Sequence, residues 1–155
     1  MLQVSPEPTA ISDAPRDRLL HGPDTLFVYG TLQFDDVLRA LLGRVPATRA
    51  ATANGWRAAA LKGRVYPGLI PSGQQTASGL LLTDLSDTEW RILDNFEDDS
   101  YELQQLPLAA GSHGWAYLWP GHDVLPLNWD ASAFRSDHLT AYVARCAARR
   151  PTLLP

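Results

Sequence analysis

The sequence predicts an α+β protein of one domain, with a small mixed, barrel-like β-sheet and a few short helices. Three observations predict this class. The length of 155 residues is usual for one domain with a single core. Strand-like segments dominate the middle of the chain, and helix-like segments are few and short. Because helices and strands do not alternate regularly, a series of βαβ units is not expected.

Residues 1–23 are predicted to be a disordered extension that contributes no fold, ahead of a domain at residues 24–150. They carry prolines and acidic residues throughout and show no hydrophobic periodicity. They lack the basic start and apolar centre of a signal peptide, so we expect a cytoplasmic protein. The preference for alanine and arginine, with Lys62 as the only lysine, is typical of a GC-rich bacterial genome.

The first half of the domain is expected to form strands around one helix. Residues 25–29 are predicted to form a buried strand. A helix should follow, ended by Gly43, because apolar residues recur at helical spacing at Phe34, Val37, Leu38, Leu41 and Leu42. Residues 49–73 are rich in glycine and proline and predict short strands and turns. Residues 77–85 predict another buried strand.

The second half is expected to contain two helices and two strands. Ser86 and Glu89 have the spacing of a capping box, which predicts a helix from Ser86 to about Asn95. Residues 101–108 and 114–120 predict strands. Residues 132–150 predict one C-terminal helix, whose shared face carries Phe134, His138, Ala141, Tyr142 and Arg145.

The turn between the first strand and the first helix is a candidate anion site. A helix start leaves backbone N–H groups unpaired, and these groups attract an anion together with the helix dipole. Gly30 permits tight or positive-φ geometry, so the N–H groups of Gly30, Thr31 and Leu32 can approach a ligand. No phosphate-binding glycine motif is present, which favours a carboxylate. The alternative is structural: Gly30 makes the turn and Thr31 caps the helix.

A cluster of acidic residues follows the helix that starts at Ser86, namely Asp94, Glu97, Asp98, Asp99 and Glu102. A carboxylate beside Phe96, with like charges near it, should have a raised pKa, which suits a general base that later acts as an acid. One alternative is a solvated acidic loop. A calcium loop is the other, although the spacing of an EF-hand is absent.

Several other classes of protein are disfavoured. The basic residues form no stripe, so nucleic acid is not an expected partner, and no apolar run is long enough to span a bilayer. The four histidines and Cys146 lack metal-ligand spacing, and no G-x-S-x-G motif is present. Cys146 is expected to be a small buried apolar residue. Trp115, Tyr117 and Trp119 should share one face of a strand, mostly in the core, and one of them could line a pocket.

An ordered set of short motifs resembles the gamma-glutamylcyclotransferase-like superfamily, particularly its gamma-glutamylamine cyclotransferase and AIG2-like members. The set covers about residues 25–145 and consists of FVYGTL from Phe27, GWR from Gly55, YPGLIP from Tyr66, SGLLL from Ser78, LDNFED from Leu93, Tyr101 and AYLW from Ala116. Each motif alone is only moderately specific for the family, whereas the whole set in this order is a strong indication of it.

The resemblance implies a barrel-like α+β fold with a central cavity. It implies that Tyr29, Gly30, Thr31, Leu32 and Tyr101 bind the substrate, with backbone N–H groups on its α-carboxylate, and that Glu97 is the catalytic acid and base. The implied reaction is the attack of a substrate α-amine on its own γ-carbonyl, which releases 5-oxoproline and an amine without a metal or cofactor. The alternatives are a non-catalytic carboxylate-binding protein on the same fold and an amidase that uses water.

Two residues depart from the family pattern. Leu103 stands where the family often has an arginine, two residues after the tyrosine that follows the glutamate. Asp98 stands where a glycine is frequent. The departures are compatible with the general chemistry that the resemblance implies, but they leave open which γ-glutamyl compound is the substrate.

Overall fold

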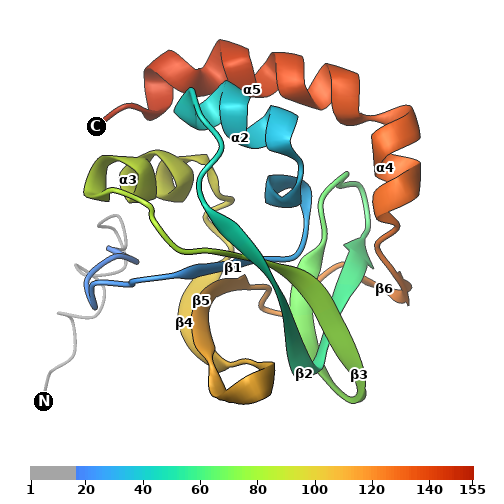
Figure 1. Cartoon of the computed structure of the whole chain (residues 1–155). Helices are drawn as coiled ribbons and strands as arrows, with labels where there is room; N and C mark the ends of the chain where they lie inside the picture. Colours follow the sequence, from blue (N-terminus) through green and yellow to red (C-terminus); the bar gives the residue numbers. More distant parts are fainter. Residues whose placement is uncertain (1–16) are drawn as a thin grey trace, which may run out of the picture.

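A computed structural model describes residues 17–155, which form a curled β-sheet covered by helices (Figure 1). The elements follow one another as β1 (Leu26–Val28), the 3-10 helix η1 (Thr31–Gln33), α2 (Asp35–Leu42), β2 (Thr48–Leu61), β3 (Gly68–Leu82), α3 (Asp87–Phe96), β4 (Glu102–Pro107), the 3-10 helix η2 (Ala109–Gly111), β5 (His113–Leu118), β6 (Val124–Asn128), α4 (Ala131–Asp137) and α5 (Leu139–Leu153). The α+β class predicted from the sequence is confirmed.

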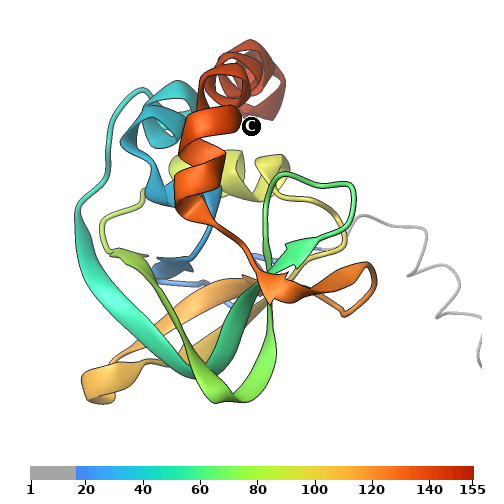
Figure 2. The same cartoon turned by 90° about the vertical axis from the view of Figure 1, so that its right-hand side faces the viewer.

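The sheet has six strands in the order β4-β5-β1-β3-β2-β6 and curls into a half-barrel (Figure 2). The curl arises because one edge of β3 pairs with β1 and β5, while the other edge pairs with β2. The C-terminal end of β3 pairs antiparallel with β1, where Leu82 faces Leu26. Its N-terminal end pairs in parallel with β5, where Leu69 faces Leu118. The curled sheet therefore has a concave interior.

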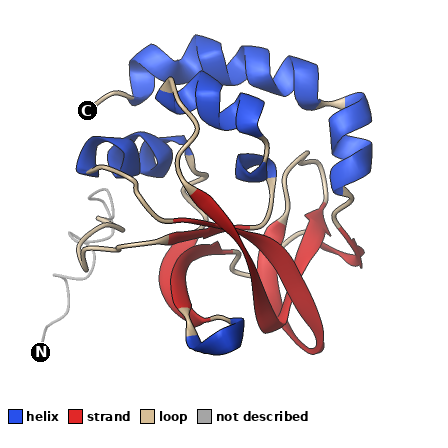
Figure 3. Cartoon of the chain, in the orientation of Figure 1, coloured by secondary structure: helices blue, strands red, loops and turns tan. Residues whose placement is uncertain are grey.

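The helices α2, α3 and α5 lie together over one end of the curled sheet (Figure 3). One apolar cluster lies between sheet and helices and includes Val37, Leu38 and Leu41 of α2. A second cluster fills the curl of the sheet itself, around Phe27 and Leu81. The site described below opens beside the first cluster, between helices and sheet.

Two predicted helices are confirmed close to their predicted bounds. Helix α2 ends at Gly43, which adopts the left-handed conformation with φ of 80°. Helix α3 begins after Ser86, whose side chain accepts a hydrogen bond from the Glu89 N–H, while the Glu89 side chain accepts one from the Ser86 N–H. The predicted capping box is therefore present.

The prediction of short strands and turns at residues 49–73 is wrong. The region instead belongs to a long hairpin in which β2 pairs antiparallel with β3 over most of its length. The glycines do not break these strands. They lie where the strand has a bulge or where another part of the chain packs closely against its backbone. Gly55, with φ of 85°, lies where the register shifts between Asn54 and Trp56. At Gly68 a Cβ atom would lie 2.5 Å from the Trp119 Cβ.

The C-terminal part also differs from its prediction. Strand β6 was not predicted, and it pairs with β2 at the edge of the sheet. It contains Pro126, which an edge strand tolerates. The single predicted helix is two helices, α4 and α5. They are divided at His138, where φ of −130° interrupts the helical geometry. Because of this break, α5 changes direction and packs against α2 (Figure 1).

The predicted N-terminal extension is described only in part. Residues 1–16 lie outside the described residues. Within residues 17–23, Leu19 packs against the cluster between sheet and helices, and the Arg18 side chain is 92% buried, leaving 8% exposed. The expectation that residues 1–23 contribute no fold therefore does not hold for Arg18 and Leu19. Across residues 17–155, no helix is long and apolar enough to cross a membrane.

Candidate active site

A cavity of about 600 Å³ lies between the sheet and the helices. Its wall comes from five separate parts of the chain: β1 with the turn after it, the β2–β3 loop, the end of α3 with the following turn, β5 and α5. All six residues that the sequence assigned to the site line this one cavity, namely Tyr29, Gly30, Thr31, Leu32, Glu97 and Tyr101. The structure thus brings the two predicted motifs together.

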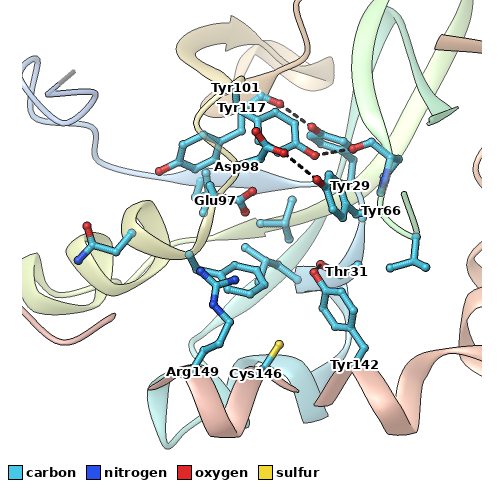
Figure 4. Close-up of a pocket in the computed structure, with 18 of the residues that line it drawn as sticks. Tyr29, Thr31, Tyr66, Glu97, Asp98, Tyr101, Tyr117, Tyr142, Cys146 and Arg149 are labelled. Carbon is cyan, nitrogen blue, oxygen red and sulfur yellow. Dashed lines mark hydrogen bonds between the residues drawn. The ribbon is translucent and has the colours of Figure 1, made fainter. Parts of the chain in front are cut away.

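Glu97 is the residue directly after α3, and its N–H donates to the Leu93 carbonyl. Its side chain points into the cavity (Figure 4). As a whole the residue is half-buried and lines the cavity, while its carboxyl group is buried. This burial raises the pKa of Glu97 to about 8; the positive charge of Arg18 opposes the shift, and the negative charges of Asp94 and Asp98 add to it. The predicted raised pKa in the acidic cluster therefore belongs to Glu97.

The two carboxylates beside Glu97 are held by hydrogen bonds. Asp94 accepts from the Tyr117 hydroxyl at 2.6 Å and forms an ion pair with Arg18 at 2.9 Å. Asp98 accepts from the Tyr66 hydroxyl at 2.7 Å and from the Ser100 N–H at 2.8 Å. Burial works against the charge of Asp98, but these hydrogen bonds outweigh it and its pKa lies below the ordinary value. Among residues 17–155, no such donor is hydrogen-bonded to the Glu97 carboxyl group, so burial dominates its pKa.

Gly30 is needed in the turn for a different reason from the one predicted. Its φ is −130°, so positive-φ geometry is not used. A Cβ atom at Gly30 would instead lie 2.7 Å from both Cδ and Cγ of Pro67. The absence of a side chain therefore lets the turn pack against the β2–β3 loop, and this contact shapes the cavity wall.

The turn also differs from a strand that leads directly into an α-helix. The 3-10 helix η1 intervenes, and the Thr31 side chain makes no capping hydrogen bond. The Thr31 hydroxyl instead lies 3.2 Å from the Tyr142 hydroxyl of α5. Within residues 17–155, the backbone N–H groups of Gly30, Thr31 and Leu32 have no hydrogen-bond acceptor. Three donors are thus available to a ligand at the cavity wall.

The tyrosines of the cavity form a rigid polar framework. The Tyr29 hydroxyl donates to the Tyr117 carbonyl at 2.5 Å, and the Tyr101 hydroxyl donates to the Pro67 carbonyl at 2.6 Å. Burial, and then nearby negative charge including Glu97, raises the pKa of Tyr29 well above its ordinary value. These neutral hydroxyl groups fix the β2–β3 loop and β5 around Glu97, and they leave the rings as cavity wall.

Helix α5 supplies the side of the cavity that faces Glu97. Cys146 is buried there as predicted, and burial raises the pKa of its thiol to about 11. Arg145 and Arg149 lie one turn apart at the rim, each with its guanidinium over an aromatic ring, at 5.5 Å from the Tyr142 centroid and 5.2 Å from the Phe96 centroid. The cavity therefore has an acidic wall at Glu97 and a basic rim on α5 (Figure 4).

Arg18 is a neighbour of the cavity that the sequence gave no reason to expect. It lies about 80 positions before Glu97 and belongs to no motif. Leu103, where the family often has an arginine, pairs with Tyr117 in the β4–β5 ladder. The guanidinium of Arg18 lies 5.1 Å from the centroid of that same Tyr117 ring. A guanidinium thus reaches this part of the site from another segment of the chain.

Metal ligands were not expected, and in the described part of the chain no group of three or more histidine, cysteine or acidic side chains is placed to hold a metal ion.

Comparison with known proteins identifies the family. The model of the family described as gamma-glutamyl cyclotransferase, AIG2-like, matches residues 26–133. AIG2-like protein D of Arabidopsis thaliana is 34% identical over 127 residues, which are 77% of this chain and 84% of the relative. AIG2-like protein C of the same plant is 35% identical over 117 residues, 71% of this chain and 68% of the relative.

Solved structures show the same fold. The solution structure of an Arabidopsis thaliana protein has a TM-score of 0.60 and 26% identity, and the match covers 79% of this chain and 87% of that one. A structure described as gamma-glutamyl cyclotransferase has a TM-score of 0.52 and 12% identity over 81% of this chain and 86% of that one, which is a likeness of fold alone. By its family match and its curated relatives, the chain belongs to the gamma-glutamyl cyclotransferase, AIG2-like family.

Proposed function

We propose that the protein is a cyclotransferase that cleaves a γ-glutamyl amide. The α-amine of the substrate attacks its own γ-carbonyl carbon, the bond between that carbon and the amide nitrogen breaks, and 5-oxoproline and a free amine leave. No water is consumed. Membership of the gamma-glutamyl cyclotransferase, AIG2-like family supports the reaction class.

One observation carries the proposal: a buried carboxyl group with a pKa of about 8 shares a cavity with a turn that has three unpaired backbone N–H groups. A γ-glutamyl amide presents a carboxylate and an amine at one end and the scissile amide at the other. The turn suits the first group, and Glu97 suits the proton transfers. A carboxyl group that is largely neutral at pH 7 also does not repel the carboxylate of the substrate.

In this proposal Glu97 moves one proton through the reaction. Its ionised form takes a proton from the α-ammonium group, which frees the amine lone pair for attack. Glu97 then gives that proton to the amide nitrogen as that nitrogen leaves, and so returns to its ionised state. The nitrogen that attacked still carries one proton more than the ring nitrogen of 5-oxoproline keeps, and the released amine takes this second proton and leaves as an ammonium ion. A pKa near 8 suits both transfers, because the group is mostly protonated at pH 7 but still has an ionised fraction that can accept a proton. Since the nucleophile belongs to the substrate, positioning supplies much of the rate.

The other site residues bind and shape the substrate. The N–H groups of Gly30, Thr31 and Leu32 hold the α-carboxylate. Tyr29 and Tyr101 keep the cavity in shape through their hydrogen bonds to Tyr117 and Pro67 and place their rings against the curled substrate chain. The substrate must curl because its amine has to reach its own γ-carbonyl to close a five-membered ring.

A set of matched compounds tests the proposal. A γ-glutamyl amide with a free α-amine should give 5-oxoproline, identified by mass spectrometry. The N-acetylated compound should give no product at saturating concentration, because its nitrogen is no longer a nucleophile. The α-linked isomer should also fail, because its amine cannot close the ring. Free glutamate as the primary product, or turnover of the N-acetyl compound, would make the protein an amidase.

The proposed role of Glu97 is tested by its isosteric variant. Glu97→Gln keeps the shape of the side chain but cannot accept the proton, so kcat should fall at least about a hundredfold, the ordinary contribution of a general acid–base group. Asp99→Asn is the matched control in the same turn and should cost much less. Equal losses in both variants would indicate a diffuse acidic patch. Ligand binding without turnover by the wild-type protein would favour the carboxylate-binding protein.

A further inference from the structure

We propose that Arg18 is a positioning residue for Glu97, and that the segment at residues 17–22 is therefore a working part of the active site. The proposal rests on the proposed role of Glu97. For residues 17–22 it reverses the expectation that the segment before the domain contributes nothing to the fold. Four hydrogen bonds, one ion pair and one ring contact of the Arg18 side chain carry it.

The guanidinium of Arg18 closes the turn that holds Glu97. The last carbonyl groups of a helix have no partner within the helix. Arg18 donates to the carbonyl oxygens of Asp94 at 2.7 Å and Glu97 at 3.2 Å, at the end of α3. It also donates to the carbonyl oxygens of Asp98 at 2.8 Å and Tyr101 at 3.1 Å, in the turn that follows. Both ends of the loop around Glu97 are thus tied to one group.

A guanidinium suits this position better than an ammonium group does. It carries five N–H donors in a rigid plane, so it can reach several carbonyl oxygens at once. Its remaining N–H, at Nε, forms the ion pair with the Asp94 carboxylate at 2.9 Å. One face of the plane lies over the Tyr117 ring, and the hydroxyl of Tyr117 donates to that same Asp94. The three side chains therefore support one another.

The burial of Arg18 shows that this is not a surface contact. Its side chain is 8% exposed, and Asp94 is 16% exposed. Ion pairs on an exposed surface contribute little, because water competes with them, but a buried guanidinium that loses its partners is costly to the fold. The neighbouring Leu20 is 71% exposed and provides a control within the same segment.

Arg18 also sets the charge around Glu97. It is the positive group that acts most on the Glu97 carboxyl and favours its ionised form, against burial and the charges of Asp94 and Asp98. The other titratable groups that interact with Glu97 are Tyr29 of β1, Tyr101 before β4, Tyr117 of β5, and Tyr142 and Cys146 of α5. Burial raises the pKa of each of these five groups, so they are uncharged at neutral pH and Arg18 offsets the acidic neighbours.

The test compares Arg18→Ala, Arg18→Lys and Leu20→Ala in the full chain. Loss of the guanidinium should raise the pKa of Glu97 and so reduce its ionised form near pH 7. The acidic limb of the pH profile of kcat should therefore move to higher pH in Arg18→Ala, with kcat at pH 7 lower by about tenfold for a shift of one unit. KM should change less than kcat. Leu20→Ala should match the wild type.

Arg18→Lys separates charge from geometry. It keeps a positive charge, so the pH profile should move less than in Arg18→Ala. It cannot reach four carbonyl oxygens, so kcat at the optimum pH should stay low. Added guanidinium ion at millimolar concentration should restore part of the activity of Arg18→Ala and should leave the activity of Leu20→Ala unchanged. A role in stability alone would lower the melting temperature of the Arg18 variants while leaving the pH profile in place, and this result would overturn the proposal.

A second measurement needs no turnover, so failure of the proposed function and failure of this inference can be distinguished. The pKa of the Glu97 carboxyl is followed by 13C NMR in the wild type and in Arg18→Ala. A higher value in the variant supports the inference even if no substrate is turned over. An unchanged value, in a variant that is still folded, rejects it even if the cyclotransferase assay succeeds.

Discussion

Glu97 illustrates the conflict between stability and function at the scale of one residue. Its carboxyl group has a pKa of about 8 in the folded protein, against an ordinary value of 4.5. Between these two values the folded state binds more protons than the unfolded state does, so the stability associated with Glu97 falls as pH rises towards and through 8. The fold therefore bears a cost when Glu97 is ionised, which is the form proposed to act as base.

This conflict predicts a pH-dependent effect of Glu97→Gln on stability. At pH 8.5 the variant should have a melting temperature higher than the wild type by at least about 3 °C, roughly the effect of 1 kcal/mol in a domain of this size. At pH 5.5 the difference should be much smaller, because Glu97 is then protonated and neutral. Thermal unfolding followed by circular dichroism at both values measures this. An equal difference at both values would contradict the raised pKa.

Gly30 gives a second prediction at this scale. Gly30→Ala should destabilise the protein by about 1–3 kcal/mol, the usual cost of overpacking, because the new Cβ atom would lie 2.7 Å from Pro67. It should also weaken substrate binding by moving the turn. Gly73→Ala is the control, since a Cβ atom there meets nothing within 4 Å. Urea denaturation of the two variants gives the comparison, and similar values for both would show that the Pro67 contact does not matter.

At the scale of elements, helix α3 places Glu97 by ending directly before it. Its start is fixed by the capping box of Ser86 and Glu89, and Glu89 is also held by Arg44 at 2.6 Å. Helix α3 thus connects a well-anchored start to the residue that we propose as the acid and base.

Ser86→Ala should therefore cost about 1 kcal/mol of stability, the usual loss for an N-cap residue. Thr88→Ala, an exposed change within the first turn of the same helix, should cost less. Chemical denaturation monitored by tryptophan fluorescence suits this comparison, because Trp90 lies in α3. A larger loss in Thr88→Ala than in Ser86→Ala would argue against the capping box as the anchor of the helix.

The elements that could be predicted from the sequence are those with local signals. The apolar spacing of α2, its final Gly43 and the capping box of α3 lie within a few residues of one another, so a short window contains the whole signal. The long β2–β3 hairpin was missed because its glycines resemble breaks until their partners are known: Gly68 faces Trp119, which is far away in the sequence. The break at His138 likewise has no mark in the sequence.

At the scale of the whole molecule, the cavity depends on how the chain closes on itself. The curl of β3 from β1 to β5 brings the turn at Gly30, the loop at Pro67 and the end of α3 around one space. The sequence suggested the turn and the acidic cluster as separate motifs, and only the resemblance to a family suggested that they meet. Arg18, Tyr142 and Arg149 could not be predicted as parts of the site, because tertiary contacts alone bring them there.

The central claim is that the nucleophile is the substrate's own amine and not water. Turnover of a γ-glutamyl amide in water enriched in oxygen-18, followed by mass spectrometry of the product within the first turnovers, tests this most directly. Cyclisation consumes no water, so we predict 5-oxoproline without the heavy isotope, in an amount equal to the amine released. Glutamate that carries one oxygen-18 atom in its γ-carboxyl group would contradict the claim, because that atom can enter only by hydrolysis.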